Sequence, residues 1–155
     1  MNNAFTLLEL IFVIVVIGIL AAIAVPKFTH LRDNAKISSE LSTAASVQSA
    51  VEACHGEWIV NDCGFVCGSD INSSDGDAFD ATVGYPKILG EHLQHILKKG
   101  SSDWQCDESD SPIVCQGPAS RDDSGVNNCK PDKPCATKCW KYYESNGTFA
   151  LESGC

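Results

Sequence analysis

The chain has 155 residues, room for about one folded domain, and its 20 acidic and 11 basic side chains give a net charge of −9. From Glu57 onward there are 16 acids and 8 bases, so most of the negative charge lies in the C-terminal part. This charge excludes a general affinity of that part for nucleic-acid phosphates. The sequence shows no Ser-His-Asp set, glycine-rich phosphate loop or acid/base pair, so we do not expect an enzyme.

The N-terminal segment is a candidate membrane span. Residues 5–25 are apolar apart from Thr6 and Glu9. As a helix they would rise about 31 Å, which matches the hydrocarbon core of a bilayer. An uncleaved membrane anchor is the simplest interpretation. A carboxylate in such a segment is costly unless it is paired, so Glu9 is a candidate functional residue that requires a partner.

The helical pattern continues over residues 26–54. Its larger apolar positions recur at spacings near three and four, which is typical of an amphipathic helix. These positions are Phe28, Leu31, Ala35, Leu41, Ala45, Val47, Val51 and Cys54. Together with the apolar segment they predict one helix of about 50 residues and about 75 Å. Gly18 and Pro26 are its weak points, because glycine has a high backbone entropy and proline lacks an N–H.

The N-terminal residues also carry a family resemblance. Ala4 is followed by Phe5-Thr-Leu-Leu-Glu9-Leu, an apolar run, Gly18 and Pro26. This order resembles the N-terminus of type IV pilins and type II secretion pseudopilins, over about residues 1–54. The resemblance implies that a prepilin peptidase cuts between Ala4 and Phe5 and methylates the new amine. It also implies that residues 18–26 unwind when subunits assemble.

The resemblance predicts the organisation of the chain. Residues 1–4 would be a leader peptide, 5–25 a transmembrane and assembly helix, 26–54 its amphipathic continuation, and 55–155 a disulfide-rich globular head. The precursor would lie in the inner membrane, meet an assembly platform there, and polymerise into a helical filament outside the cell. The leading hypothesis is a structural type IV pilin. The alternatives are a pseudopilin of a periplasmic pseudopilus and a minor pilin that binds DNA or another ligand.

The head is expected to be small and rich in loops. Residues 55–85 contain five glycines among Asp, Asn and Ser clusters, which favours a loop. Residues 86–99 predict a short helix that ends at Gly100. Strands are expected at residues 103–106, 113–116, 139–143 and 148–151, the last two flanking the hairpin signal Asn146-Gly147. A long helix followed by a small antiparallel sheet is an α+β, pilin-like fold.

Nine cysteines, all at or after Cys54, indicate an oxidising compartment. The odd number leaves one cysteine free or paired between chains. The spacings Cys63-x3-Cys67 and Cys135-x3-Cys139 do not fit a zinc site, and disulfides are favoured. The expected bridges are Cys106 to Cys115 across a hairpin, Cys54 to Cys63 or Cys67, and Cys139 or Cys129 to Cys155.

Few residues suggest a metal, and we expect no cofactor. His92 and His95 would share a helix face, but no third ligand is evident, so surface histidines are favoured. The run from Asp70 to Asp80 also contains Asp75 and Asp77 and offers oxygen ligands for calcium. It misses the EF-hand pattern, and an acidic solvated loop is the alternative interpretation.

Two further patterns lie in the head. Four lysines, Lys130, Lys133, Lys138 and Lys141, flank Trp140 in an otherwise acidic region, a pattern compatible with DNA binding or with solvated lysines around a half-buried hairpin. Asn72 and Asn146 each begin an N-x-[ST] glycosylation acceptor, and Asn146 also fits a plain hairpin turn.

Overall fold

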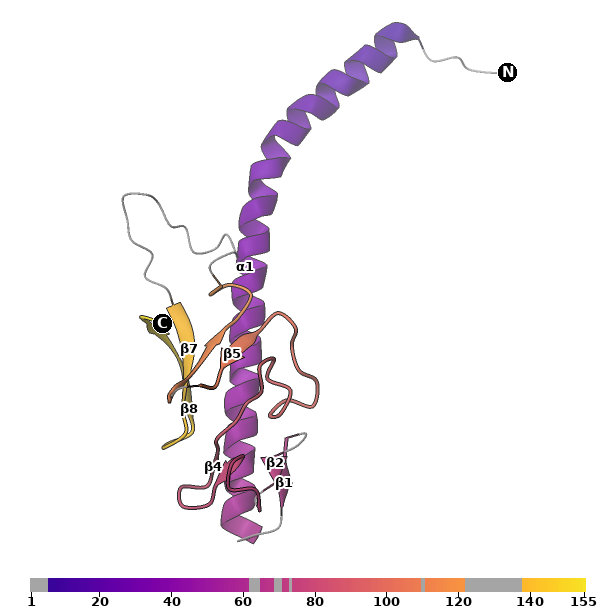
Figure 1. Ribbon diagram of the computed structural model, residues 1–155. Coiled ribbons are helices and arrows are strands. Elements are labelled where there is room, and N and C mark those ends of the chain that lie inside the picture. Colours follow the sequence, from indigo (N-terminus) through magenta and orange to yellow (C-terminus); the bar gives the residue numbers. More distant parts are fainter. Residues whose placement is uncertain (1–5, 62–64, 69–70, 73, 110, 122–137) are drawn as a thin grey trace, which may run out of the picture. The chain divides into compact units, whose positions relative to one another are not determined.

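The computed structural model describes residues 6–61, 65–68, 71–72, 74–109, 111–121 and 138–155 (Figure 1). Within these residues the helix α1 (Leu7–Asn61) is followed by short strands: β1 (Val66–Cys67), β2 (Ile71–Asn72), β3 (Phe79–Asp80), β4 (Tyr85–Pro86), β5 (Gln105–Asp107), β6 (Ile113–Gln116), β7 (Lys138–Tyr143) and β8 (Thr148–Ser153). The chain divides into two compact units, Met1–Ala35 and Lys36–Cys155, and α1 contributes to both. A long helix with small antiparallel sheets confirms the predicted α+β fold class.

The part of α1 inside the second unit buries one stripe of side chains. Its buried residues are Glu40, Ala44, Val47, Val51 and Cys54. Their spacings of four and three residues place them on one face of the helix. The stripe joins a core that includes Trp104, Ile113, Tyr142 and Phe149. The face predicted from sequence was partly wrong, because Leu41 and Ala45 lie outside the stripe and are exposed.

In the described residues the main sheet has four antiparallel strands in the order β5-β6-β7-β8. The strand predictions at residues 113–116, 139–143 and 148–151 are confirmed, and β5 lies near its expected place. Cys106 lies opposite Cys115 in the β5–β6 pair, and Trp140 lies opposite both Cys115 in β6 and Leu151 in β8. Because side chains alternate along a strand, those of Cys139 and Trp140 point to opposite faces of the sheet.

The β7–β8 connection is longer than the Asn-Gly signal predicts. Tyr143 pairs with Thr148, so residues 144–147 form the turn. The N–H of Gly147 donates to the Tyr143 carbonyl at 2.8 Å, and its φ of 67° lies in the left-handed region. A Cβ at this position would run into the ring of Tyr85, so the turn requires glycine for two reasons.

The helix predicted over residues 86–99 is absent; this segment forms turns. Gly90 and Leu93 have φ values of 86° and 59°, which interrupt a right-handed helix. The carboxylate of Glu108 accepts hydrogen bonds from the backbone N–H groups of Leu89 and Gly90, at 2.6 and 2.7 Å. The apolar residues are buried nonetheless: Leu89, Leu93 and Ile96 all belong to the core. The pattern predicted burial correctly and backbone conformation wrongly.

The described residues between 55 and 85 contain helix and strands where the sequence predicts a loop. The helix α1 does not stop near residue 54 but continues to Asn61. The His55 ring stacks on Tyr85 with centroids 4.3 Å apart, and its Nδ1 lies 3.0 Å from the Gly84 carbonyl oxygen. These contacts hold the last turns of the helix against the head. The strand pairs β1–β2 and β3–β4 follow within the same segment.

Candidate assembly surface and other candidate sites

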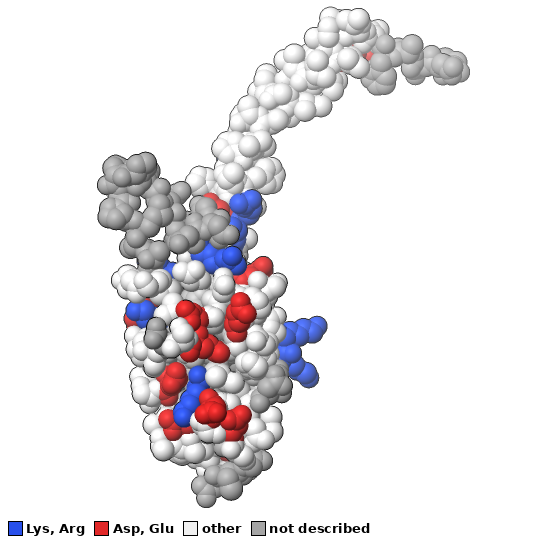
Figure 2. Space-filling view, viewed as in Figure 1, with Lys and Arg blue, Asp and Glu red and all other residues white. Residues whose placement is uncertain are grey.

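The first unit presents an apolar helix surface without internal partners. The large apolar side chains of residues 7–25 are between 38% and 79% exposed, on all sides of the helix. In Figure 2 this stretch is white apart from one red group close to its N-terminal end. Among the described residues, α1 is the one helix long and apolar enough to cross a membrane. Exposure of this much apolar surface indicates a partner outside the chain.

Glu9 is the single charged residue in this surface. Its backbone N–H donates to the carbonyl oxygen of Thr6 at 3.1 Å and lies 3.3 Å from the Thr6 hydroxyl, which caps the helix. No hydrogen bond or ion pair of its carboxylate is found within the described part of the chain. Ala4 and Phe5, the residues expected to flank the cleavage site, lie outside the described residues.

The expected weak points lie within continuous helix in the single chain. Pro26 stands inside α1, where its missing N–H leaves the carbonyl of Ala22 without its usual partner. The Thr29 hydroxyl donates to the Pro26 carbonyl oxygen at 2.8 Å. A Cβ on Gly18 would meet nothing within 4 Å, so packing inside the chain does not require this glycine. Any need for it arises from a partner or from a change of conformation.

Three disulfides join cysteines within the described residues of the head. They join Cys54 to Cys67, Cys106 to Cys115, and Cys139 to Cys155, and each lies among the pairs that the sequence predicts. Cys63, Cys129 and Cys135 lie outside the described residues.

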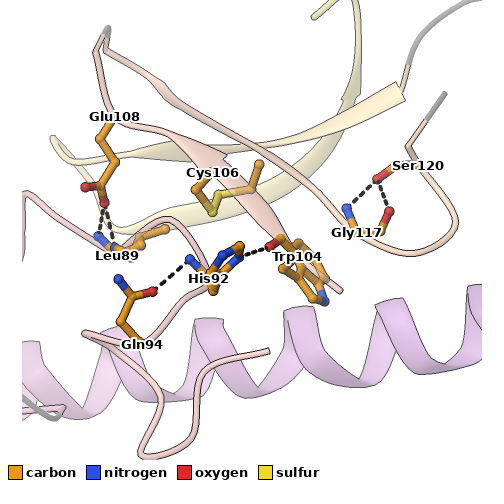
Figure 3. The surroundings of a disulfide bond; sticks show 10 residues. Leu89, His92, Gln94, Trp104, Cys106, Glu108, Gly117 and Ser120 are labelled. Carbon is orange, nitrogen blue, oxygen red and sulfur yellow. Dashed lines mark hydrogen bonds between the residues drawn. A yellow bond between two sulfur atoms is a disulfide. The ribbon is translucent and has the colours of Figure 1, made fainter. Parts of the chain in front are cut away.

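The bridge at Cys106 sits among the turns that replace the expected helix. Figure 3 shows the Glu108 carboxylate directed at the Leu89 backbone and the His92 ring directed at the carbonyl of Trp104. The Nδ1–H of His92 donates to that carbonyl at 2.6 Å. Because this segment forms turns and no helix, His92 and His95 do not share a helix face.

In the lysine and aromatic pattern, the described aromatic residue Trp140 is buried. Trp140 is 7% exposed, and its Nε1–H donates to Glu40 inside the protein at 2.7 Å. Lys141 lies 3.8 Å from the Glu152 carboxylate, while Lys138 is exposed on β7. Trp140 thus faces α1 from its position in the sheet, and DNA binding through the lysines stays a prediction. Lys130 and Lys133 lie outside the described residues.

In the acidic run that was a candidate calcium site, the side chains of Asp75 and Asp80 cap turns. An Asp75 carboxylate oxygen accepts the backbone N–H of Asp77 at 3.0 Å, and Asp80 accepts both the N–H and the hydroxyl of Thr82. The Thr82 hydroxyl and backbone N–H lower the pKa of the Asp80 carboxyl. Among the described residues no three metal-ligating side chains come together, and Asp70 lies outside them.

The two candidate glycosylation sites are both exposed. The side-chain oxygen of Asn72 accepts the backbone N–H of Ser74 at 2.9 Å, and that of Asn146 accepts the N–H of Thr148 at 3.0 Å. Both asparagines therefore stabilise local turns, and modification of either one remains a prediction.

A buried carboxylate that the sequence analysis missed ties the head to α1. Glu40 is 4% exposed, and its Oε2 accepts the backbone N–H groups of Ala119 and Ser120 at 2.6 and 2.9 Å, while its Oε1 accepts the indole N–H of Trp140. A Cβ on Gly117 would collide with this carboxylate, which explains the glycine. One feature of the sequence could have identified Glu40 as buried: it lies four residues before Ala44 and therefore on the same face of the helix.

Comparison with known proteins agrees with the N-terminal pattern. Residues 1–25 match the family model described as the prokaryotic N-terminal methylation motif. A type IV narrow pilus major component, PilA5, from Thermus thermophilus is 56% identical over 31% of this chain and 41% of its own length. A type IV major fimbrial protein, FimA, from Dichelobacter nodosus is 37% identical over 35% of each chain.

A longer match extends into the head. A fimbrial protein from Neisseria meningitidis is 28% identical over 83% of this chain and 81% of its own length. No solved structure matches. The alignments with PilA5 and FimA span less than half of those proteins, so the strongest similarity lies in the helix. The N-terminal segment of this chain is therefore similar to that of type IV pilins, and the long helix with small antiparallel sheets is a pilin-like α+β fold.

Proposed function

We propose that this protein is a structural subunit of a type IV pilus, made as an inner-membrane precursor and polymerised through α1 into an extracellular filament. The observation that carries the proposal is the exposed apolar surface of residues 7–25, joined to a disulfide-linked head. The relatives described above are pilus and fimbrial subunits, which favours a pilus over a type II secretion pseudopilus. An inner-membrane assembly platform would move the subunit from membrane to filament.

Processing is the first step that the proposal requires. A prepilin peptidase would cut between Ala4 and Phe5 and methylate the amine of Phe5, as the match to the methylation motif supports. Mass spectrometry of the N-terminal peptide from assembled filaments should find N-methylated Phe5 as the first residue. Filaments whose subunits begin at Met1 would contradict the proposal.

Glu9 would act after this cut. Its carboxylate lies in hydrocarbon before assembly and among packed apolar helices afterwards, and neither environment tolerates an unpaired charge. The α-amine of Phe5 is the cation available at that depth, either in the same subunit or in its neighbour. Pairing between subunits would set their axial register. Removing one partner of such a buried pair costs about 3–5 kcal/mol, because the other charge stays uncompensated.

The test compares two matched substitutions. Glu9→Ala should still insert in the membrane and be cleaved but should form little or no filament. Glu91→Ala removes an exposed carboxylate from the head and should leave filament yield unchanged. Sheared filament, quantified against total pilin by immunoblot, measures the difference. Normal filament yield from Glu9→Ala would remove Glu9 from the assembly mechanism.

The segment 18–26 would act as a stretch point in the filament. Gly18 has no packing role in the single chain, and Pro26 already breaks one helical hydrogen bond. We expect these residues to lose helical hydrogen bonds on assembly. A filament map that showed continuous helix through this segment would refute the expectation.

A further inference from the structure

Two cations follow the apolar segment at the depth of a lipid headgroup layer. Residues 7–25 of α1 rise about 28 Å, close to the hydrocarbon thickness of about 30 Å. Lys27 therefore stands at the edge of the hydrocarbon, and Arg32 lies about 7.5 Å farther along the helix. Each polar layer of a bilayer is about 5–7.5 Å thick. Both cations are exposed and fall within that layer.

The two cations are placed around the helix instead of forming one patch. Five residues at 100° each put Lys27 and Arg32 about 140° apart around the axis. Phe28 and Leu31 lie between them and are 67% and 66% exposed. Cations that flank exposed apolar side chains are typical of a helix at a membrane interface. A contact with one neighbouring protein would favour a patch on one side.

The positive charge is not cancelled locally. Asp33 is the one acidic residue between Leu10 and Ser39. It adjoins Arg32 in sequence, and neighbouring positions on a helix do not face each other. The described residues contain no ion pair of Lys27 or Arg32 with an acid.

Membrane topology does not explain these cations. Lys and Arg prefer the cytoplasmic side of a span, yet residues 1–6 contain none of either. Lys27 and Arg32 follow the span in the sequence, as does the disulfide-linked head, which belongs in an oxidising compartment. Their position opposes the orientation rule, so that rule does not account for them.

We propose that Lys27 and Arg32 form a collar that binds anionic phospholipid headgroups around the precursor before it enters the filament. The collar would gather lipids such as phosphatidylglycerol beside the helix and fix its depth in the bilayer. Leaving the membrane for the filament would then require release of these lipids. This inference rests on the membrane-anchored precursor of the proposed function.

The experiment uses the full chain reconstituted in phosphatidylcholine vesicles that contain a minor fraction of phosphatidylglycerol. Spin-labelled lipids of each type report the relative association constant at the protein. The unaltered chain should favour phosphatidylglycerol about fivefold per cation at low salt, and the preference should fall as salt is added. The double variant Lys27→Gln/Arg32→Gln should lose the preference.

The matched control removes two cations elsewhere. Lys98→Gln/Lys99→Gln makes the same charge change in the exposed part of the head and should keep the preference. An unaltered chain without preference, a collar variant that keeps it, or equal loss in the control would overturn the inference. A collar variant that keeps the lipid preference but stops forming filaments would assign the cations to contacts between copies, which also overturns it.

Flotation in alkaline carbonate separates this inference from the function on which it rests. A chain that floats with the vesicles but shows no preference overturns the collar alone. A chain that does not float overturns the membrane-anchored precursor and the collar with it.

Discussion

Two stretches of the same helix differ in where their apolar side chains find partners. Residues 7–25 are apolar on every side and exposed on every side. Between Glu40 and Cys54 a single stripe is buried and the remaining positions are mostly polar or exposed. An all-round apolar helix requires partners outside the chain, whereas a stripe requires one face inside it. The comparison separates assembly from stability: changes in the first stretch should affect filaments, and changes in the second should affect folding.

The largest expected effect on stability is that of Glu40→Ala. This substitution removes the carboxylate that accepts three buried hydrogen bonds. The donors are the backbone N–H groups of Ala119 and Ser120 and the indole N–H of Trp140. We expect a loss of about 3–5 kcal/mol in the free energy of unfolding. Urea unfolding of the full chain in detergent, followed by tryptophan fluorescence, measures it. Glu57→Ala, at an exposed position of α1, should change stability by less than about 0.5 kcal/mol; equal losses would refute the role of Glu40.

Loss of a head disulfide should come next. Cys139→Ser/Cys155→Ser opens a bridge that spans 16 residues, and loop-closure entropy predicts a cost of about 3 kcal/mol. Cys106→Ser/Cys115→Ser opens a bridge that spans 9 residues, so its cost should be slightly smaller. Thermal unfolding of both variants tests the order. A Cys106/Cys115 variant that lost more stability would show that strain or packing outweighs loop length.

A matched pair of valines tests the comparison most simply. Val51 is fully buried in the stripe, and Val13 is 45% exposed in the apolar surface. Val51→Ala should cost about 2 kcal/mol of head stability through lost burial and a cavity. Val13→Ala should leave the free energy of unfolding of the head unchanged within about 0.5 kcal/mol. If Val13→Ala destabilised the head as much, the apolar surface would have partners inside the chain.

The smallest expected effect concerns Tyr142 at alkaline pH. Burial, with the nearby Glu144 carboxylate, raises the pKa of its phenol above the usual value of about 10. The folded state therefore keeps the proton that the unfolded state releases, and the associated stability is lost as pH rises above about 10. Tyr142→Phe loses the hydrogen bond to the Pro86 carbonyl, about 1 kcal/mol, but should be less sensitive to alkali. Urea unfolding at pH 8 and pH 11 tests this, and equal pH sensitivity would contradict it.

The sequence predicted those parts of the fold that local patterns determine. Alternating residues and turn signals gave β6, β7 and β8, and the pairing of β5 with β6 placed Cys106 opposite Cys115. The predicted helix over residues 86–99 failed because Leu93 adopts a left-handed conformation and the distant Glu108 binds the backbone there. Neither feature is visible in hydrophobic periodicity.

The candidate sites were predictable to different degrees. The apolar helix and Glu9 are evident from composition and motif alone. Glu40 was missed because a charged residue is ordinarily assigned to the solvent face, and its partners at Ala119 and Trp140 lie about 80 to 100 residues away. Trp140 was a possible ligand-binding residue for the converse reason: its neighbours in sequence are lysines, but its neighbours in space are buried.

A high-resolution map of the assembled filament tests the central claim most directly. The account predicts that residues 7–25 are buried against other copies of the chain and that the Glu9 carboxylate lies within about 4 Å of the α-amine of Phe5. It also predicts helical hydrogen bonds missing between residues 18 and 26. A filament in which residues 7–25 remained exposed, or in which Glu9 faced solvent without a cation, would contradict the account.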